Sequence, residues 1–125
     1  MKIPKVLIVD DLGLNRRLLR AICESGGMET LEAEDGEDAL ELMKSITPDA
    51  IISDILMPRM DGYRFCKEVR SNPKTGAIPF IIYTSTYVSA GEEAFALVCG
   101  ADKYLKKPVP AEDLLRILRG LIAAG

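Results

Sequence analysis

Acidic side chains follow two of the apolar runs in this sequence. Asp10 and Asp11 come directly after the run VLIV, and Asp54 comes directly after the run AIIS. A hydroxyl and a positive charge, those of Thr84 and Lys107, stand at the ends of two later runs. A carboxylate nucleophile surrounded by cations and a hydroxyl is suited to phosphoryl transfer, because the group in transit carries negative charge on its oxygens.

The three acids imply a metal ion. Carboxylates gathered in one crevice repel one another and raise one another's pKa unless a cation joins them. A hard divalent ion such as Mg2+ relieves this repulsion, because it takes oxygen ligands and typically binds one or two carboxylates plus a phosphate. Lys107 would then supply positive charge, and the hydroxyl of Thr84 a hydrogen bond, to the remaining phosphoryl oxygens. We therefore expect Mg2+ as the cofactor.

Short apolar runs that alternate with amphipathic stretches must position these side chains. The alternation predicts five strands and five helices. The strands are expected at residues 6–9, 30–33, 50–53, 80–83 and 104–105, and the helices at 14–23, 39–43, 63–69, 92–98 and 114–122.

The predicted fold is α/β, a parallel sheet with helices on both faces. The runs VLIV and AIIS lack polar alternation, which is typical of strands covered on both sides. Ligands of such sheets bind beyond the carboxyl ends of the strands, where the strand order reverses. In the flavodoxin-like order 2-1-3-4-5 the first and third strands are neighbours, so their acids meet in one crevice. We expect one domain over residues 1–125.

Two apolar stripes are interpreted as core-facing. In the first helix, Leu14, Leu18 and Ile22 recur every four residues and are flanked by Leu19 and Cys23. The stripe near the end of the chain consists of Leu114, Leu115, Leu118, Leu121 and Ile122. Packing is favoured over partner recognition for both, because surface helices bury one face.

The composition excludes several kinds of site. The chain has no histidine, which excludes imidazole metal sites, Ser-His or Cys-His nucleophile pairs, and phosphate donation from a histidine of its own. Its net charge of -3 predicts no direct nucleic-acid binding. Cys23, Cys66 and Cys99 are widely spaced in apolar patterns and are interpreted as core residues in a reducing compartment. No apolar run suits a signal peptide or a membrane span, so the cytoplasm is expected.

Each of these residues also has an ordinary structural interpretation. Asp11 suits the cap of the first helix, and Asp54 suits the end of any strand. Thr84 fits β-propensity, Tyr104 suits simple packing, and Lys107, like Lys106 beside it, suits a solvated surface. None of the residues identifies a function by itself.

Five motifs resemble, in order, those of two-component response-regulator receiver domains. They are VLIVDD followed by Asn15-Arg16, AEDGEDAL, PDAIISDILMPRMDG, IPFIIYTS and GADKYLKKP. The resemblance covers nearly the whole chain, and it turns separate, weak signals into one joint hypothesis.

The resemblance implies a role for each acid. Carried over residue by residue, it makes Asp54 the phosphoacceptor and Asp10 and Asp11 the pair that holds Mg2+. Asp11 would bind directly and Asp10 partly through water, with Asp54 and the backbone carbonyl of Leu56 as further ligands.

The resemblance also implies a switch. Thr84 would be the switch hydroxyl, Tyr104 the aromatic residue whose rotamer reports activation, and Lys107 the lysine that pairs with the phosphoryl group. Lys107 rather than Lys106 matches, because it directly precedes Pro108. The Lys107–Pro108 peptide bond is expected to be cis, as in the family.

Two positions are expected to tune turnover of the phosphoryl group. Leu56 stands where other family members often carry a polar residue, and Thr86 lies two residues beyond Thr84. A leucine side chain cannot orient an attacking water, so slow hydrolysis is expected.

The expected function is that of a signalling switch, not a metabolic enzyme. The donor would be a histidine kinase or a histidine phosphotransfer protein. An output protein or domain would dock on the face of the fourth helix, fifth strand and fifth helix. A phosphohydrolase of aspartyl-phosphate type and an interaction module that is never phosphorylated stay as alternatives, and a flavin or dinucleotide carrier lacks its glycine-rich turn. The sequence is compatible with a stand-alone protein or with part of a longer regulator or hybrid kinase.

Overall fold

Strands and helices alternate along the chain in the computed structural model, which describes residues 2–85 and 89–124. The strands are β1 (Lys5–Val9), β2 (Glu29–Ala33), β3 (Ala50–Ser53), β4 (Phe80–Thr84) and β5 (Lys103–Lys106). The helices are α1 (Gly13–Ser25), α2 (Gly36–Leu42), α3 (Gly62–Ser71), α4 (Ala90–Val98) and α5 (Ala111–Ala124). Every predicted strand and helix is present, with its ends shifted by a few residues.

The strands form one parallel sheet in the order β2-β1-β3-β4-β5, which confirms the predicted flavodoxin-like fold. β1 and β3 are neighbours, and Val9 pairs with Ser53 at their carboxyl ends. Asp10 and Asp54 therefore leave the sheet side by side. Where β4 and β5 end, Thr84 pairs with Lys106, which brings the residue after β5 to the same edge.

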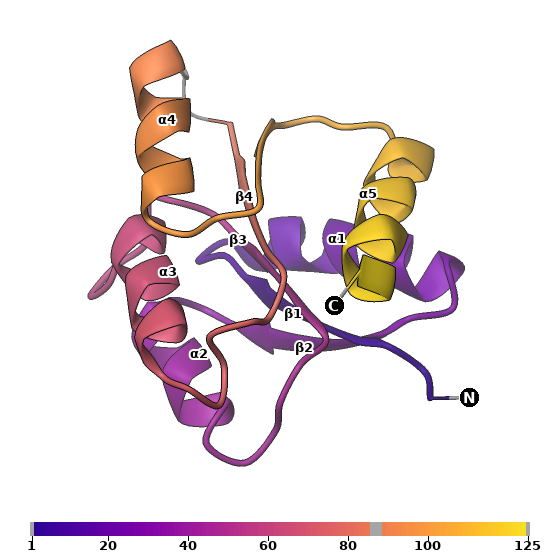
Figure 1. Cartoon of the computed structure of the whole chain (residues 1–125). Helices are drawn as coiled ribbons and strands as arrows, with labels where there is room; N and C mark the ends of the chain where they lie inside the picture. The colour runs from indigo at the N-terminus through magenta and orange to yellow at the C-terminus, as the bar shows by residue number, and fades with distance from the viewer. Residues whose placement is uncertain (1, 86–88, 125) are drawn as a thin grey trace.

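Helices cover both faces of the sheet. Figure 1 shows α1 and α5 on one side and α2, α3 and α4 on the other. Leu7 and Val9 of β1 belong to one buried cluster, and Val6 and Ile8 belong to the second. Successive strand residues point to opposite faces. A strand covered on both sides therefore needs apolar residues at every position.

The predicted core-facing stripe of α1 is wrong at two positions. Leu14 and Leu18 are 64% and 57% exposed, whereas Leu19 and Cys23 are buried and Ile22 packs partly against the core. A step of four residues turns about 40° too far on an α-helix, so residues spaced by four drift off the buried face. The stripe of α5 is core-facing as predicted.

All three cysteines are free and buried, as predicted. Burial raises the pKa of the Cys23 thiol to about 11 and that of Cys66 to about 12, so both stay protonated. Among the described residues, no helix combines the length and the apolar character that a membrane span requires.

Candidate functional site

Asp10 and Asp54 meet at one lysine. Lys107 Nζ lies 2.9 Å from Oδ2 of Asp10 and 3.4 Å from Oδ2 of Asp54. All three side chains are largely buried, with exposed fractions of 2% for Asp10, 13% for Asp54 and 16% for Lys107. Two carboxylates and an ammonium group, far apart in the sequence, thus form one compact crevice at the carboxyl ends of β1, β3 and β5.

The Asp10 carboxylate is held from several sides. Its Oδ1 accepts a hydrogen bond from the backbone N–H of Leu12 at 2.9 Å, and Oδ2 accepts one from Asn15 Nδ2 at 3.2 Å. Arg16 Nη1 donates to the Asp10 carbonyl at 2.6 Å. The first turn of α1 therefore fixes both the side chain and the backbone of Asp10, which assigns a positioning task to Asn15 and Arg16.

Asp11 does not cap α1. The residue at the N-cap position is Leu12, and no side chain caps the helix there. Asp11 is exposed, and within the part of the chain that the structure describes it makes no hydrogen bond or ion pair. The ordinary interpretation of Asp11 as a helix cap is therefore wrong, and its side chain is exposed to solvent.

Asp54 is held by its own loop. Its Oδ1 accepts a hydrogen bond from the Ile55 N–H at 2.7 Å, and its carbonyl accepts one from Ser53 Oγ at 2.8 Å. The first residue of α3, Gly62, donates its N–H to the Ile55 carbonyl at 2.9 Å. A Cβ at Gly62 would collide with the Asp54 carbonyl oxygen, so glycine lets α3 begin directly against the backbone of Asp54 and Ile55.

Lys107, not Lys106, points into the crevice. Its peptide bond to Pro108 is cis, as predicted. Its N–H donates to the Thr84 carbonyl at 2.9 Å, and its Nζ lies 5.6 Å from the centre of the Tyr83 ring. Burial lowers the pKa of Lys107, but the hydrogen bond to Asp10 and the charge of Asp54 outweigh it, so the pKa is raised and the group stays charged.

The predicted switch residues lie beside the crevice. Thr84 is fully buried at the end of β4. Tyr104 is half-buried, and its hydroxyl is buried without a hydrogen-bond partner in the part of the chain described here. Burial raises the pKa of this phenol far above its ordinary value, and the nearby Tyr63, Glu92 and Asp54 raise it further. Thr86 lies outside the described residues.

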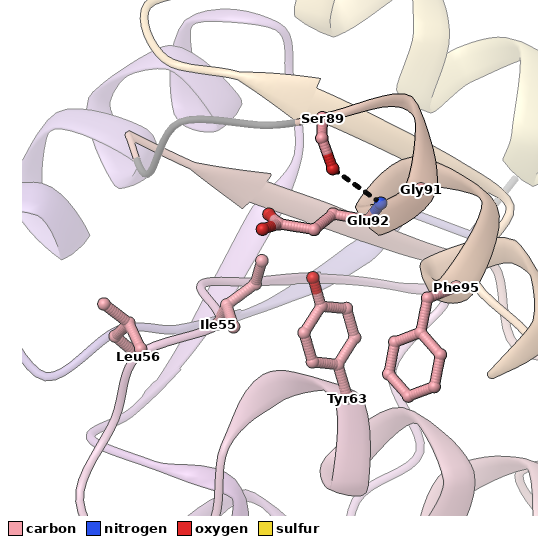
Figure 2. A pocket seen from close by; sticks show the side chains of 7 residues that line it. All are labelled: Ile55, Leu56, Tyr63, Ser89, Gly91, Glu92 and Phe95. Carbon is pink, nitrogen blue, oxygen red and sulfur yellow. Dashed lines mark hydrogen bonds between the residues drawn. The ribbon is translucent and has the colours of Figure 1, made fainter.

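A pocket of about 410 Å³ opens next to the crevice, between the loop after β3 and the start of α4. Figure 2 shows Ile55 and Leu56 on one side of it and Phe95 and Ser89 on the other, with the Tyr63 hydroxyl and the Glu92 carboxylate directed into the space between. Leu56 is 66% exposed. Its side chain therefore lines one edge of the pocket and is otherwise largely in solvent.

The donor chemistry of the crevice fits a hard cation. Asp10 and Asp54 each place a carboxylate oxygen next to the Lys107 ammonium, and the exposed Asp11 directly follows Asp10 in the chain. Across residues 2–85 and 89–124, no three acidic, histidine or cysteine side chains surround a common point. The positive charge in this structure is supplied by Lys107, while the oxygen ligands that Mg2+ prefers are close by.

The comparisons with known proteins decide the family. Residues 6–119 match the family model described as the response regulator receiver domain. The chain belongs to the response-regulator receiver family. Response regulator MprA of Mycolicibacterium vanbaalenii is 37% identical over 118 residues, which cover 94% of this chain and 50% of that protein. The receiver domain thus spans about half the length of the curated relatives it matches.

Solved structures share the fold. A putative response regulator from Chloroflexus aurantiacus superposes with a TM-score of 0.91 at 33% identity, covering 98% of this chain and 99% of that one. The receiver domain of a sensor histidine kinase from Pseudomonas aeruginosa superposes with a TM-score of 0.87 at 29% identity, with 98% and 99% covered. The latter structure has a magnesium ion coordinated in its active site cleft.

Sequence reasoning missed two residues that hold Asp10 in the candidate site. Asn15 and Arg16 appeared only as part of a motif, and their contacts to Asp10 follow from the first turn of α1. The exposure of Leu14 and Leu18 was also missed. A helical wheel with 100° per residue, drawn for all residues of α1, would have placed Leu14 and Leu18 away from the buried face.

Proposed function

We propose that Asp54 accepts a phosphoryl group from a phosphohistidine of a histidine kinase or histidine phosphotransfer protein. The observation that carries the proposal is the Lys107 ammonium held between Asp10 and Asp54. An oxygen of Asp54 attacks phosphorus, the bond between phosphorus and the donor imidazole nitrogen breaks, and that nitrogen keeps the electron pair and takes up a proton. Lys107 then pairs with a phosphoryl oxygen in place of the carboxylate.

We assign the Mg2+ ligands to Asp10, Asp11, Asp54 and the carbonyl of Leu56. The ion neutralises charge on the phosphoryl oxygens when it is bound. Asp11 suits direct binding, because its carboxylate is exposed and uncommitted among the described residues. Asp10 suits a supporting role, since its oxygens already accept from Leu12, Asn15 and Lys107. The magnesium ion coordinated in the active site cleft of the related histidine-kinase receiver domain supports Mg2+ as the cofactor.

The donor is expected to dock on α1. A pocket of about 570 Å³ runs between α1 and the segment after β5, and its lining includes Leu18, Asn15 and Lys107. The exposed Leu14 and Leu18 lie on the same helix. Because Asn15 and Lys107 also contact Asp10, a helix packed into this pocket would place its histidine next to Asp54.

The response is expected at Tyr104 and α4. Phosphorylation adds about 1.5 to 2 negative charges at pH 7 and would draw the Thr84 hydroxyl toward the phosphoryl group. Tyr104 can then change rotamer without breaking a hydrogen bond, since its hydroxyl makes none within the described structure. The apolar side chains of Phe95, Leu97 and Val98 are exposed on α4. We expect the output protein or domain to dock over the face formed by α4, β5 and α5.

The receiver domain is a signalling protein, and we propose that its catalysis is limited to its own phosphorylation and dephosphorylation. We further propose that residues 1–125 act as one domain. The three free thiols fit the reducing cytoplasm that the sequence predicts.

A phosphodonor experiment tests the central proposal. Incubation with acetyl phosphate and Mg2+ should add one phosphoryl group, located on Asp54 by mass spectrometry. Asp54→Asn should abolish the label, because an amide is a poor nucleophile. The proposal fails if the label is found on another residue or if the variant is labelled as fully as the parent.

A further inference from the structure

The loop after β3 contains a strained turn at Arg59. The N–H of Met60 donates to the carbonyl of Pro58 at 2.6 Å, which closes a three-residue turn around Arg59. Arg59 has φ 64°, and it is the one described residue other than glycine with positive φ. A γ-turn with positive φ is rare and strained. A residue persists in such a conformation only when its surroundings hold it there.

A buried carboxylate holds Arg59. Arg59 Nη2 lies 2.6 Å from Asp35 Oδ2, and Arg59 Nε donates to the same oxygen at 2.8 Å. Asp35 is 1% exposed, and its Oδ1 accepts from the Asp38 N–H at 2.9 Å and so caps α2. Burial raises the pKa of Asp35, but the Asp38 N–H and the Arg59 guanidinium outweigh it, so Asp35 stays ionised at neutral pH.

This ion pair joins two loops that pack closely. Arg59 belongs to the loop between β3 and α3, and Asp35 to the turn between β2 and α2, 24 residues earlier. A Cβ at Gly36 would meet Met60 Cγ at 2.9 Å and Phe65 Cβ at 2.9 Å, so the two segments touch at this point. The strained turn is therefore anchored to the start of α2.

The anchored segment carries the residue assigned to metal binding. Ile55 and Met60 are buried at its two ends, whereas Leu56 and Pro58 between them are exposed. Within the described chain, Arg59 is the one side chain of residues 56–59 with an ion pair or hydrogen bond. Pro58 also limits the backbone of the residue before it. Only two residues, Met57 and Pro58, separate Arg59 from Leu56, and the proline restricts the backbone conformations open to them.

We propose that Arg59 is a positioning residue which, through its ion pair with the buried Asp35, orients the Leu56 carbonyl toward the cation site of the crevice. The inference rests on the proposed function, since it deepens the assignment of Leu56 as a ligand. Its role is indirect: the side chain contacts Asp35 and Glu37, and it acts through the backbone of residues 56–59.

The double variant Asp35→Asn/Arg59→Gly tests the inference. Glycine accepts positive φ without strain, and asparagine still caps α2 while leaving no unpaired buried charge. We expect the midpoint of thermal unfolding to stay within a few degrees of the parent. Mg2+ affinity, measured by calorimetric titration, should fall by about tenfold, the lower end for residues that support metal ligands. Amide shifts of Ile55 and Leu56 should change without Mg2+ present.

A second readout separates positioning from damage. At saturating Mg2+, the rate of phosphorylation by acetyl phosphate should return to the parent value, because a displaced ligand weakens binding without removing the nucleophile. Unchanged Mg2+ affinity, or a loss that high Mg2+ does not restore, would overturn the inference. Arg20→Ala removes a comparable but exposed ion pair, to Glu24 at 2.8 Å, and should behave like the parent. A parent chain that is never labelled at Asp54 would instead refute the proposed function.

Discussion

The crevice around Asp54 and the region around Tyr104 lie on one sheet but differ in how fully their polar groups are satisfied. Both oxygens of Asp54 have donors, the Ile55 N–H and Lys107. The buried hydroxyl of Tyr104 has no hydrogen-bond partner in the described structure, and a pocket opens beside it. Hydrogen bonds and an ion pair hold the Asp54 side chain in position, whereas movement of the Tyr104 hydroxyl breaks no hydrogen bond within the described residues. This difference suits a protein in which one region does chemistry and another reports it.

Lys107→Ala should have the largest effect, because it disrupts the crevice around Asp54. It removes the cation shared by Asp10 and Asp54, and removing one preorganised donor typically costs about 100-fold to 1,000-fold in rate. We expect the rate of phosphorylation by acetyl phosphate to fall by about 100-fold or more. Mass spectrometry of samples taken over time measures this rate. Lys106→Ala, at the exposed neighbour, is the matched control. Equal rates in the two variants would show that the crevice does not depend on Lys107.

Asp11→Ala should weaken Mg2+ binding while leaving the fold unchanged. Asp11 is exposed and does not cap α1, so its loss costs little stability. As a direct ligand it should cost at least about tenfold in Mg2+ affinity, measured by calorimetric titration. Glu34→Ala removes another exposed acid and serves as the control. If Asp11→Ala bound Mg2+ and accepted phosphate as well as the parent, Asp11 would have no part in the site.

Leu56→Asn should shorten the life of the phosphorylated state. The exposed leucine cannot orient an attacking water, whereas an amide at this position can. We expect phosphate release to accelerate several-fold, with phosphorylation by acetyl phosphate unchanged. A release rate equal to or below that of the parent would show that this position does not limit turnover.

Tyr104→Phe should have the smallest effect. It tests whether the hydroxyl in the Tyr104 region contributes to stability. A buried polar group without a partner costs about 1–3 kcal/mol, so its removal should leave the free energy of unfolding equal or raise it by about 1 kcal/mol. Urea denaturation measures the change. Phosphorylation of Asp54 should proceed at the parent rate. A loss of stability would mean that the hydroxyl has a partner and that the Tyr104 region is as firmly held as the crevice.

Periodicity and motif order were sufficient for most of the fold. Runs such as VLIV and AIIS indicate strands buried on both faces, and all predicted elements are present. The strand order followed from the doubly wound α/β pattern, and the cis bond before Pro108 followed from the family resemblance. Both are confirmed. The stripe of α1 was misjudged at Leu14 and Leu18 because a spacing of four approximates the helical repeat without matching it.

The sequence by itself determined the types of residue available: three acids, a threonine and a lysine after apolar runs, and no histidine to serve as a donor. Only the tertiary structure decided which of them meet. Lys107 reaches Asp10 across 97 positions, and Arg59 reaches Asp35 across 24. Such contacts depend on the strand order and on where each loop leaves the sheet. The local pattern of a sequence does not specify which loops will meet, because loop closure and packing bring distant segments together only in the folded chain.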